Sequence, residues 1–142
     1  MKRLLITLFV SLFCGVLYAQ NEIGIWETYD NKRDKPMSHV QIYQQNGKLY
    51  GKVVKVLDES YKTCTRCSGE NKNKPVVGLM VIRGLEKKGS KWEKDDGILD
   101  PVSGLIIDGQ LWMDGSDKLK VKGTWGFISD TQTWKRVVDN KK

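Results

Sequence analysis

The residues best suited to chemistry are two cysteines three positions apart, Cys64 and Cys67. They are the only cysteines after residue 19, and in an oxidising compartment such a pair is expected to form a disulfide. A redox-active pair is an alternative, because Lys62 and Arg66 favour the thiolate. A zinc site is a third, although zinc usually takes about four ligands and the chain has a single histidine. The loop-forming residues that follow favour a structural disulfide.

The other candidates for chemistry are His39 and three nearby aspartates, Asp95, Asp96 and Asp100. His39 alternates with apolar neighbours, which places it on the polar face of a strand, and nothing in the sequence marks a nucleophile to pair with it. The aspartates suggest a calcium site or paired carboxylates, but their spacing is not that of an EF-hand loop. Asp-Gly and Asp-Pro are also ordinary turn sequences. We therefore predict no catalytic residue, metal site or cofactor, and a protein that is not an enzyme.

The elements that must position these residues are short β-strands. Asn46-Gly47 is a strong hairpin signal between the alternating runs Val40–Gln45 and Lys48–Leu57. The clearest strand is Lys118–Phe127, which places five residues on one face: Leu119, Val121, Gly123, Trp125 and Phe127. Further breaks are predicted at Asp96-Gly97 and Ser129-Asp130. About eight such strands predict an all-β, antiparallel up-and-down barrel, and only residues 76–85 are apolar enough to suggest a helical turn.

The N-terminus has the pattern of an export signal. Lys2 and Arg3 precede an apolar run from Leu4 to Leu17, and Ala19 is a small residue suited to cleavage. We predict a cleaved signal peptide over residues 1–19, a single barrel domain over residues 20–142, and a periplasmic or secreted protein. An uncleaved membrane anchor is the alternative. No second apolar run suggests a membrane span.

The charge of the chain is positive but dispersed. The formal net charge is +7, and the basic residues do not gather into a block. Nucleic acid is therefore not an expected partner, and a solvated, charged surface is the simpler interpretation.

Gly24-Ile25-Trp26 resembles the Gly-x-Trp of the first strand in lipocalins and related calycins. In those barrels the tryptophan closes one end, and a basic residue of the last strand packs over it. The resemblance implies that Trp26 is such a plug and that Arg136, in the sequence Thr133-Trp134-Lys135-Arg136, covers it.

A wider set of motifs resembles the exported bacterial domain-of-unknown-function 2147 family. The set comprises residues 47–55, 64–70, 75–79, 97–101 and 133–136. The family implies a lipocalin-like barrel and no established reaction. This chain departs from the family pattern at two places. The family usually has a tyrosine a few residues after the glycine that corresponds to Gly104, whereas here Leu105, Ile106 and Ile107 follow it. The family also tends to have Gly-Arg where this chain has Ser129-Asp130.

Two interpretations of the function follow. The first is a binding module that takes a small hydrophobic or amphipathic molecule into the barrel, because small and medium side chains on the inward faces leave room. The residues expected at its pocket are Tyr50, Val53, Asp100, Leu111, Val121 and Trp125. The second is an envelope interaction protein with a filled barrel, which binds a protein or polysaccharide through its loops. The long connection over residues 58–75, fixed by the cysteine pair, is the feature that suggests it.

Overall fold

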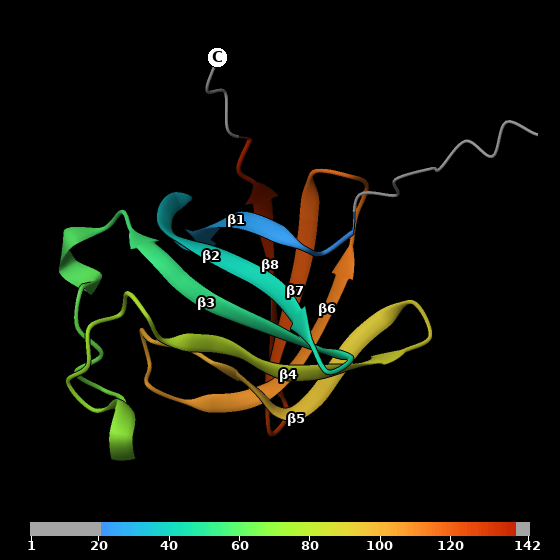
Figure 1. The fold of residues 1–142 in the computed structure, drawn as a ribbon. Coiled ribbons are helices and arrows are strands. Elements are labelled where there is room, and N and C mark those ends of the chain that lie inside the picture. The colour runs from blue at the N-terminus through green and yellow to red at the C-terminus, as the bar shows by residue number, and fades with distance from the viewer. Residues whose placement is uncertain (1–20, 139–142) are drawn as a thin grey trace, which may run out of the picture.

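The computed structural model describes residues 21–138, which form a closed barrel of eight strands. The strands are β1 (Gly24–Asp30), β2 (Lys35–Gln45), β3 (Lys48–Val56), β4 (Met80–Lys88), β5 (Lys91–Leu99), β6 (Ile106–Met113), β7 (Lys118–Trp125) and β8 (Ile128–Arg136). Each strand pairs antiparallel with the next along the chain, and β8 returns to pair with β1 (Figure 1). The all-β, up-and-down barrel predicted from the sequence is confirmed.

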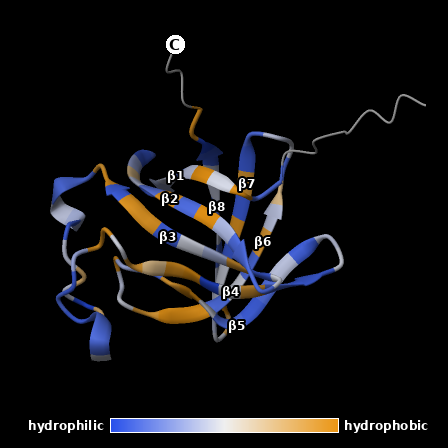
Figure 2. Cartoon of the chain, viewed as in Figure 1, coloured by the Kyte–Doolittle hydropathy of each residue, from blue (hydrophilic) through white to orange (hydrophobic). Residues whose placement is uncertain are grey.

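The barrel forms because apolar and polar residues alternate along the strands. On β7, Leu119 and Val121 are buried inside, whereas Lys118 and Lys120 lie on the outer wall. Figure 2 shows this alternation as bands of hydrophobic and hydrophilic colour along the strands. At some inward positions only glycine leaves room for the facing side chain: a Cβ at Gly51 would lie 2.7 Å from Cγ1 of Ile82 on β4. The sheet can therefore curl tightly at that point.

Three local predictions were wrong. Asp96-Gly97 does not end a strand but lies within β5, at an irregular pairing where Asp96 has a φ of 54°. Ser129-Asp130 lies within β8, because the chain turns three residues earlier at Gly126, whose φ is 60°. Residues 76–85 hold no helical turn and lead instead into β4.

One end of the barrel is closed by Trp26, which is fully buried. The Arg136 guanidinium lies 4.3 Å from the centre of the Trp26 ring. It also donates hydrogen bonds to three backbone carbonyl oxygens, those of Ser116 (2.9 Å), Ile23 (3.0 Å) and Asn21 (2.6 Å). Arg136 thus joins the start of β1, the β6–β7 turn and the end of β8.

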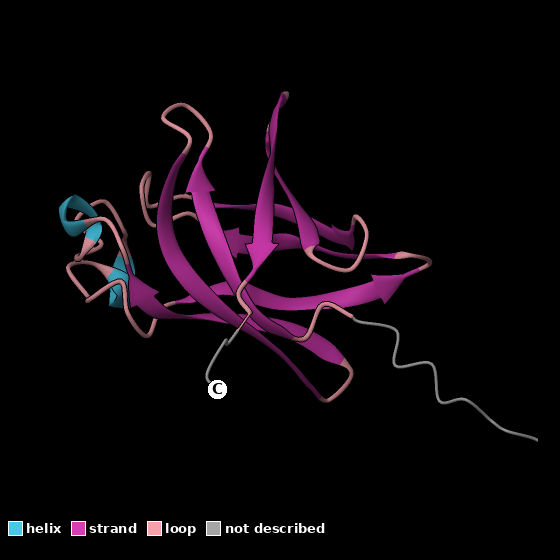
Figure 3. Ribbon diagram, turned by 90° about the horizontal axis from the view of Figure 1, so that it is seen from above, coloured by secondary structure: helices cyan, strands magenta, loops and turns pink. Residues whose placement is uncertain are grey.

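The opposite end carries the two longest connections, residues 57–79 and 100–105, together with the turns at residues 31–34 and 126–127. The connection 57–79 contains two short 3-10 helices, η1 (Glu59–Tyr61) and η2 (Gly69–Asn71), which lie together on one side of the strands (Figure 3). The Cys64–Cys67 disulfide lies between them and is buried.

The predicted signal peptide falls on residues 1–19, which lie outside the described residues. Within residues 21–138, no helix is long and apolar enough to cross a membrane.

Replacing Arg136 with alanine should lower the free energy of unfolding by about 1–3 kcal/mol, because the cation–π contact and three charge-assisted hydrogen bonds are lost together. Chemical denaturation measured by tryptophan fluorescence gives the value. The matched control is Lys118→Ala, an exposed cation on the neighbouring β7, which should change stability little. Equal effects of the two substitutions would contradict the role given to Arg136.

Candidate functional site

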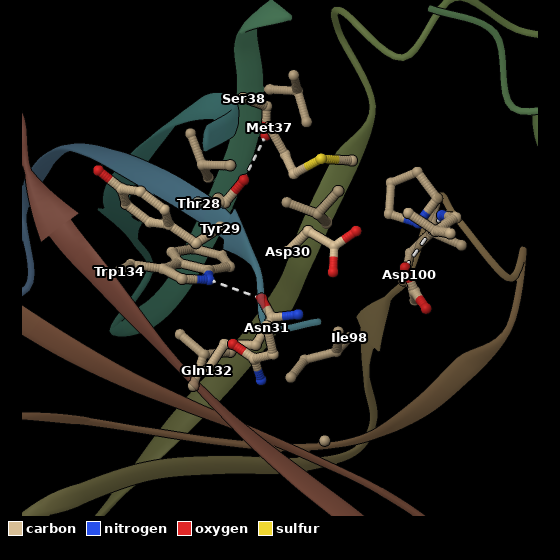
Figure 4. Close-up of a pocket in the computed structure, with 18 of the residues that line it drawn as sticks. Thr28, Tyr29, Asp30, Asn31, Met37, Ser38, Ile98, Asp100, Gln132 and Trp134 are labelled. Carbon is tan, nitrogen blue, oxygen red and sulfur yellow. Dashed lines mark hydrogen bonds between the residues drawn. The ribbon is translucent and has the colours of Figure 1, made fainter. Parts of the chain in front are cut away.

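A cavity of about 350 Å³ opens at the end of the barrel opposite Trp26. Residues from all eight strands line it together with the loops of that end. Figure 4 shows Thr28 and Trp134 on one side of the pocket and Asp100 on the other. The barrel is therefore packed solid at one end and hollow at the other.

The floor and one wall of the cavity are aliphatic. The residues that form them include Val53, Val81, Ile82, Ile98, Leu99, Ile107 and Val121. Most of these side chains are buried and belong to the hydrophobic core. A polar group placed against this wall would lose its hydrogen bonds to water without replacement, so the wall favours an apolar ligand.

The opposite wall is polar because β1 and β8 are no longer paired there. Within residues 21–138 these two strands pair only at Trp26–Arg136 and Glu27–Lys135, next to the closed end. Beyond that point side chains replace the backbone ladder. The Asn31 amide donates to the Asp130 carboxylate at 3.1 Å and 3.3 Å, which bridges the gap at the rim.

Two further polar contacts lie deeper on this wall. Trp134 is buried and donates its Nε1–H to Oε1 of Gln132 at 3.1 Å. The hydroxyl groups of Thr28 and Ser38 lie 2.8 Å apart, both buried. Hydroxyl and amide groups of this kind can exchange partners with a bound molecule, so the wall offers hydrogen bonds to a ligand.

Tyr61 and Asp100 form the third side of the mouth. Burial, followed by the nearby Asp100 carboxylate, raises the pKa of the Tyr61 phenol, so its hydroxyl stays protonated and able to donate. Asp100 accepts from the backbone N–H of Val102 at 3.0 Å and from the Ser103 hydroxyl at 2.8 Å. These bonds hold the 100–105 turn in shape.

The disulfide predicted between Cys64 and Cys67 is confirmed, and it supports this side of the mouth. Cys64 Sγ lies 3.6 Å from the carbonyl oxygen of Pro101. Gly104, with a φ of 75°, approaches so closely that a Cβ there would lie 1.9 Å from the carbonyl oxygen of Arg66. The cysteine loop and the 100–105 turn are thus packed backbone to backbone, and only glycine fits at residue 104.

Three of the six residues expected at the pocket line it: Val53, Asp100 and Val121. The other three lie elsewhere. Tyr50 lies on the outer wall, because residues an odd number of positions apart on a strand face opposite sides and Val53 faces inward. Its ring stacks on that of Tyr43, with ring centres 5.8 Å apart.

Leu111 and Trp125 lie on the inward faces of their strands, but at positions along the barrel axis that do not line the cavity. Leu111 is fully buried in the hydrophobic core, where it pairs with Trp92 on β5 and with Val121 on β7, but it does not itself line the cavity. Trp125 is the last residue of β7, beyond the rim, and is 59% exposed. Phe127, expected on the same inward face, is fully exposed in the turn.

The pocket also includes residues that were not anticipated. Thr28 and Gln132 had a usable signal, since each lies two positions from a buried tryptophan and therefore shares its inward sense. Tyr61 had none, because it comes from an irregular connection whose path depends on the disulfide and on the 100–105 turn.

His39 lies on the outer wall, away from the cavity. Its Nε2 is 2.9 Å from Oε2 of Glu27, and the Tyr29 hydroxyl donates to the other oxygen of the same carboxylate. The bond from Tyr29, and to a lesser extent the contact with His39, lowers the pKa of Glu27, while the same bond raises the pKa of Tyr29 to about 12. Neither His39 nor Glu27 lines the cavity, so we assign the cluster to cross-strand stabilisation.

Asp95 and Asp96 lie exposed on β5, apart from Asp100 at the mouth. Among residues 21–138, no group of three or more potential metal-ligating side chains lies close enough together to bind an ion.

Comparison with known proteins supports the barrel architecture. Residues 24–136 match the family described as "Uncharacterized protein conserved in bacteria (DUF2147)". Among solved structures, the chain is similar to protein HP1028 from Helicobacter pylori, which is described as belonging to the lipocalin family. The TM-score is 0.68 and the identity 22%, over 82% of this chain and 83% of that chain. No curated protein matches the sequence.

The Cys64–Cys67 disulfide should be structural. Because both cysteines are buried, the native protein should resist mild reductant, and it should not catalyse the reduction of insulin. Mass spectrometry after alkylation measures the free thiols. The denatured protein, treated with the same reductant, is the control and should become fully alkylated. Sustained insulin reduction would contradict a structural role.

The Glu27 carboxylate should make stability depend on acid pH. Because folding lowers its pKa from the usual 4.5, its contribution is present above that value and is lost as the pH falls through the lowered one. Glu27→Gln should therefore destabilise the protein at pH 7 and have less effect at pH 3. Urea unfolding at both pH values measures the two differences. A difference that does not change with pH would contradict the assignment.

Proposed function

Because this chain belongs to the DUF2147 family and folds as a lipocalin-like barrel, we propose that it is a binding module for a small hydrophobic or amphipathic molecule. The observation that carries the proposal is the cavity at the open end, with an aliphatic floor and a polar wall. Its volume of about 350 Å³ is near the lower limit of small-molecule sites, which run from about 300 to 1,000 Å³.

The arrangement of the walls suggests how the molecule sits. An apolar body would contact Val53, Ile98 and Val121 at depth, where burial of its surface is favourable. Its polar end would remain near the rim, within reach of Asp100 and Gln132. A molecule with both parts matches the whole lining. A purely polar molecule would bury polar groups against the aliphatic floor without hydrogen-bond partners.

The compartment proposed for this activity is outside the cytoplasm. The disulfide supports it, because disulfides persist mainly in oxidising environments. The predicted signal peptide over residues 1–19 gives the same location, and the processed domain over residues 20–142 is part of this proposal.

Ligand binding should raise the melting temperature. A site-specific ligand at one hundred times its dissociation constant stabilises the folded state by about 2.7 kcal/mol. A screen of fatty acids, quinones and apolar dyes by differential scanning fluorimetry measures this shift. Binding should also change the emission of Trp134, which lines the cavity, and a Trp134→Phe variant identifies its share of the signal.

Two neighbouring valines on β3 provide a matched pair of variants. Val53 is 1% exposed and lines the cavity, whereas Val54 is 39% exposed on the outer wall. Val53→Phe should fill the cavity and abolish the ligand-induced melting shift, while Val54→Phe should leave it unchanged. Circular dichroism without ligand checks that both variants fold. If Val53→Phe does not fold, Val121→Phe takes its place. If no compound shifts the melt, or if both variants bind equally, the cavity is not the binding site.

A further inference from the structure

The open end of the barrel exposes several large apolar side chains beside the mouth of the cavity. We define this group as the rim patch, formed by Leu105, Ile106, Trp125, Phe127 and Ile128. All five side chains are exposed, Phe127 completely and Trp125 and Ile128 by 59% and 67%. Isolated exposed hydrophobic residues are normal, but a contiguous group marks an interaction site.

The strand register brings most of these positions together around the β7–β8 hairpin. Trp125 pairs with Ile128 across the β7–β8 hairpin. On the other side, Asp108 of β6 pairs with Thr124 of β7. Continuing this antiparallel pairing by two positions brings Ile106 beside Gly126, at the tip of the same hairpin.

Polar residues follow directly behind the tip of the β7–β8 hairpin. Phe127, in the turn itself, is fully exposed, so nothing else in the fold covers it. Lys122, Thr124 and Asp130 stand on the strands just behind the tip. An apolar tip followed by a polar band matches the boundary between lipid chains and headgroups, where tryptophan is especially favourable.

The charge of this end selects among membrane surfaces. The segments 30–35, 57–79, 100–105 and 126–130 together carry seven lysine and arginine residues and seven aspartate and glutamate residues. The end that carries the rim patch is thus neutral, although the whole chain is at +7. A neutral end suits a zwitterionic lipid surface and gives no long-range attraction to a strongly charged partner.

We propose that the open end docks on a lipid bilayer, with Trp125, Phe127 and Ile128 inserted at the level of the headgroups. The mouth of the cavity then faces the lipid, so an apolar molecule passes between bilayer and barrel without crossing water. This goes beyond the proposed function, because the docking requires no ligand in the cavity.

The test uses the protein in its processed form, without added ligand, and vesicles of phosphatidylcholine. In flotation assays the protein should rise with the vesicles, and F127D/I128D should reduce the bound fraction about tenfold or more, since two inserted side chains are replaced by charges. The matched control is I23D/I25D, which alters two exposed isoleucines at the closed end and should bind like the unchanged protein. Circular dichroism confirms that both variants fold.

A second measurement locates the inserted residue. Vesicles of brominated phosphatidylcholine should quench part of the tryptophan emission, and Trp125→Phe should remove most of that quenching. Equal binding by the tip and control variants would overturn the proposal, as would binding that requires anionic lipid and disappears with salt. A dimer that F127D/I128D dissociates, without any vesicle binding, would identify a second copy as the partner instead. The vesicle assay contains no ligand, so its failure leaves the cavity proposal untouched.

Discussion

The barrel depends on one seam, where the first strand meets the last. β1 and β8 pair at only two positions, whereas every other neighbouring pair of strands is joined at four or more. A ladder this short supplies few hydrogen bonds, and the Arg136 side chain adds what the backbone lacks. It lies on the Trp26 ring and donates to carbonyls on both sides of the seam. A single guanidinium can do this because its donors form a rigid fork.

The same seam explains why the barrel is hollow at one end. Where β1 and β8 stay paired, Trp26 and the surrounding aliphatic residues fill the interior. Where the two strands separate, polar side chains span the gap, and the interior is left open to ligand-sized molecules. The polar wall of the cavity therefore follows from the short pairing of these two strands.

Strand alternation in the sequence predicted the faces of the barrel but not depth along its axis. Val53 and Val121 both face inward and line the cavity, since a period of two decides inside from outside. Leu111 and Trp125 have the same inward sense, yet Leu111 is packed in the core without lining the cavity and Trp125 projects past the rim. Depth depends on strand length and stagger, and an irregular pairing such as that near Asp96 changes both.

The side of the mouth formed by loops was the least predictable part. Tyr61 reaches the cavity from a connection with no periodic pattern, held by the disulfide against the 100–105 turn. The cysteine spacing predicted the disulfide itself. The surface against which the cysteine loop packs depends on Gly104, which is distant in the sequence. Only the folded chain shows that the absence of a side chain at that glycine lets two backbones touch.

The position of the seam also determines when the molecule can finish folding. Arg136 and Ile23, which it binds, are 113 residues apart in the chain, and contacts between such distant residues form slowly. Until β8 arrives, β1 and β7 are the edges of an open, curled sheet with unpaired backbone groups, the kind of surface on which chains aggregate. A chain that emerges gradually, from a ribosome or through a membrane pore, must therefore pass through this open form. Its lifetime, rather than the stability of the finished barrel, sets the risk of aggregation.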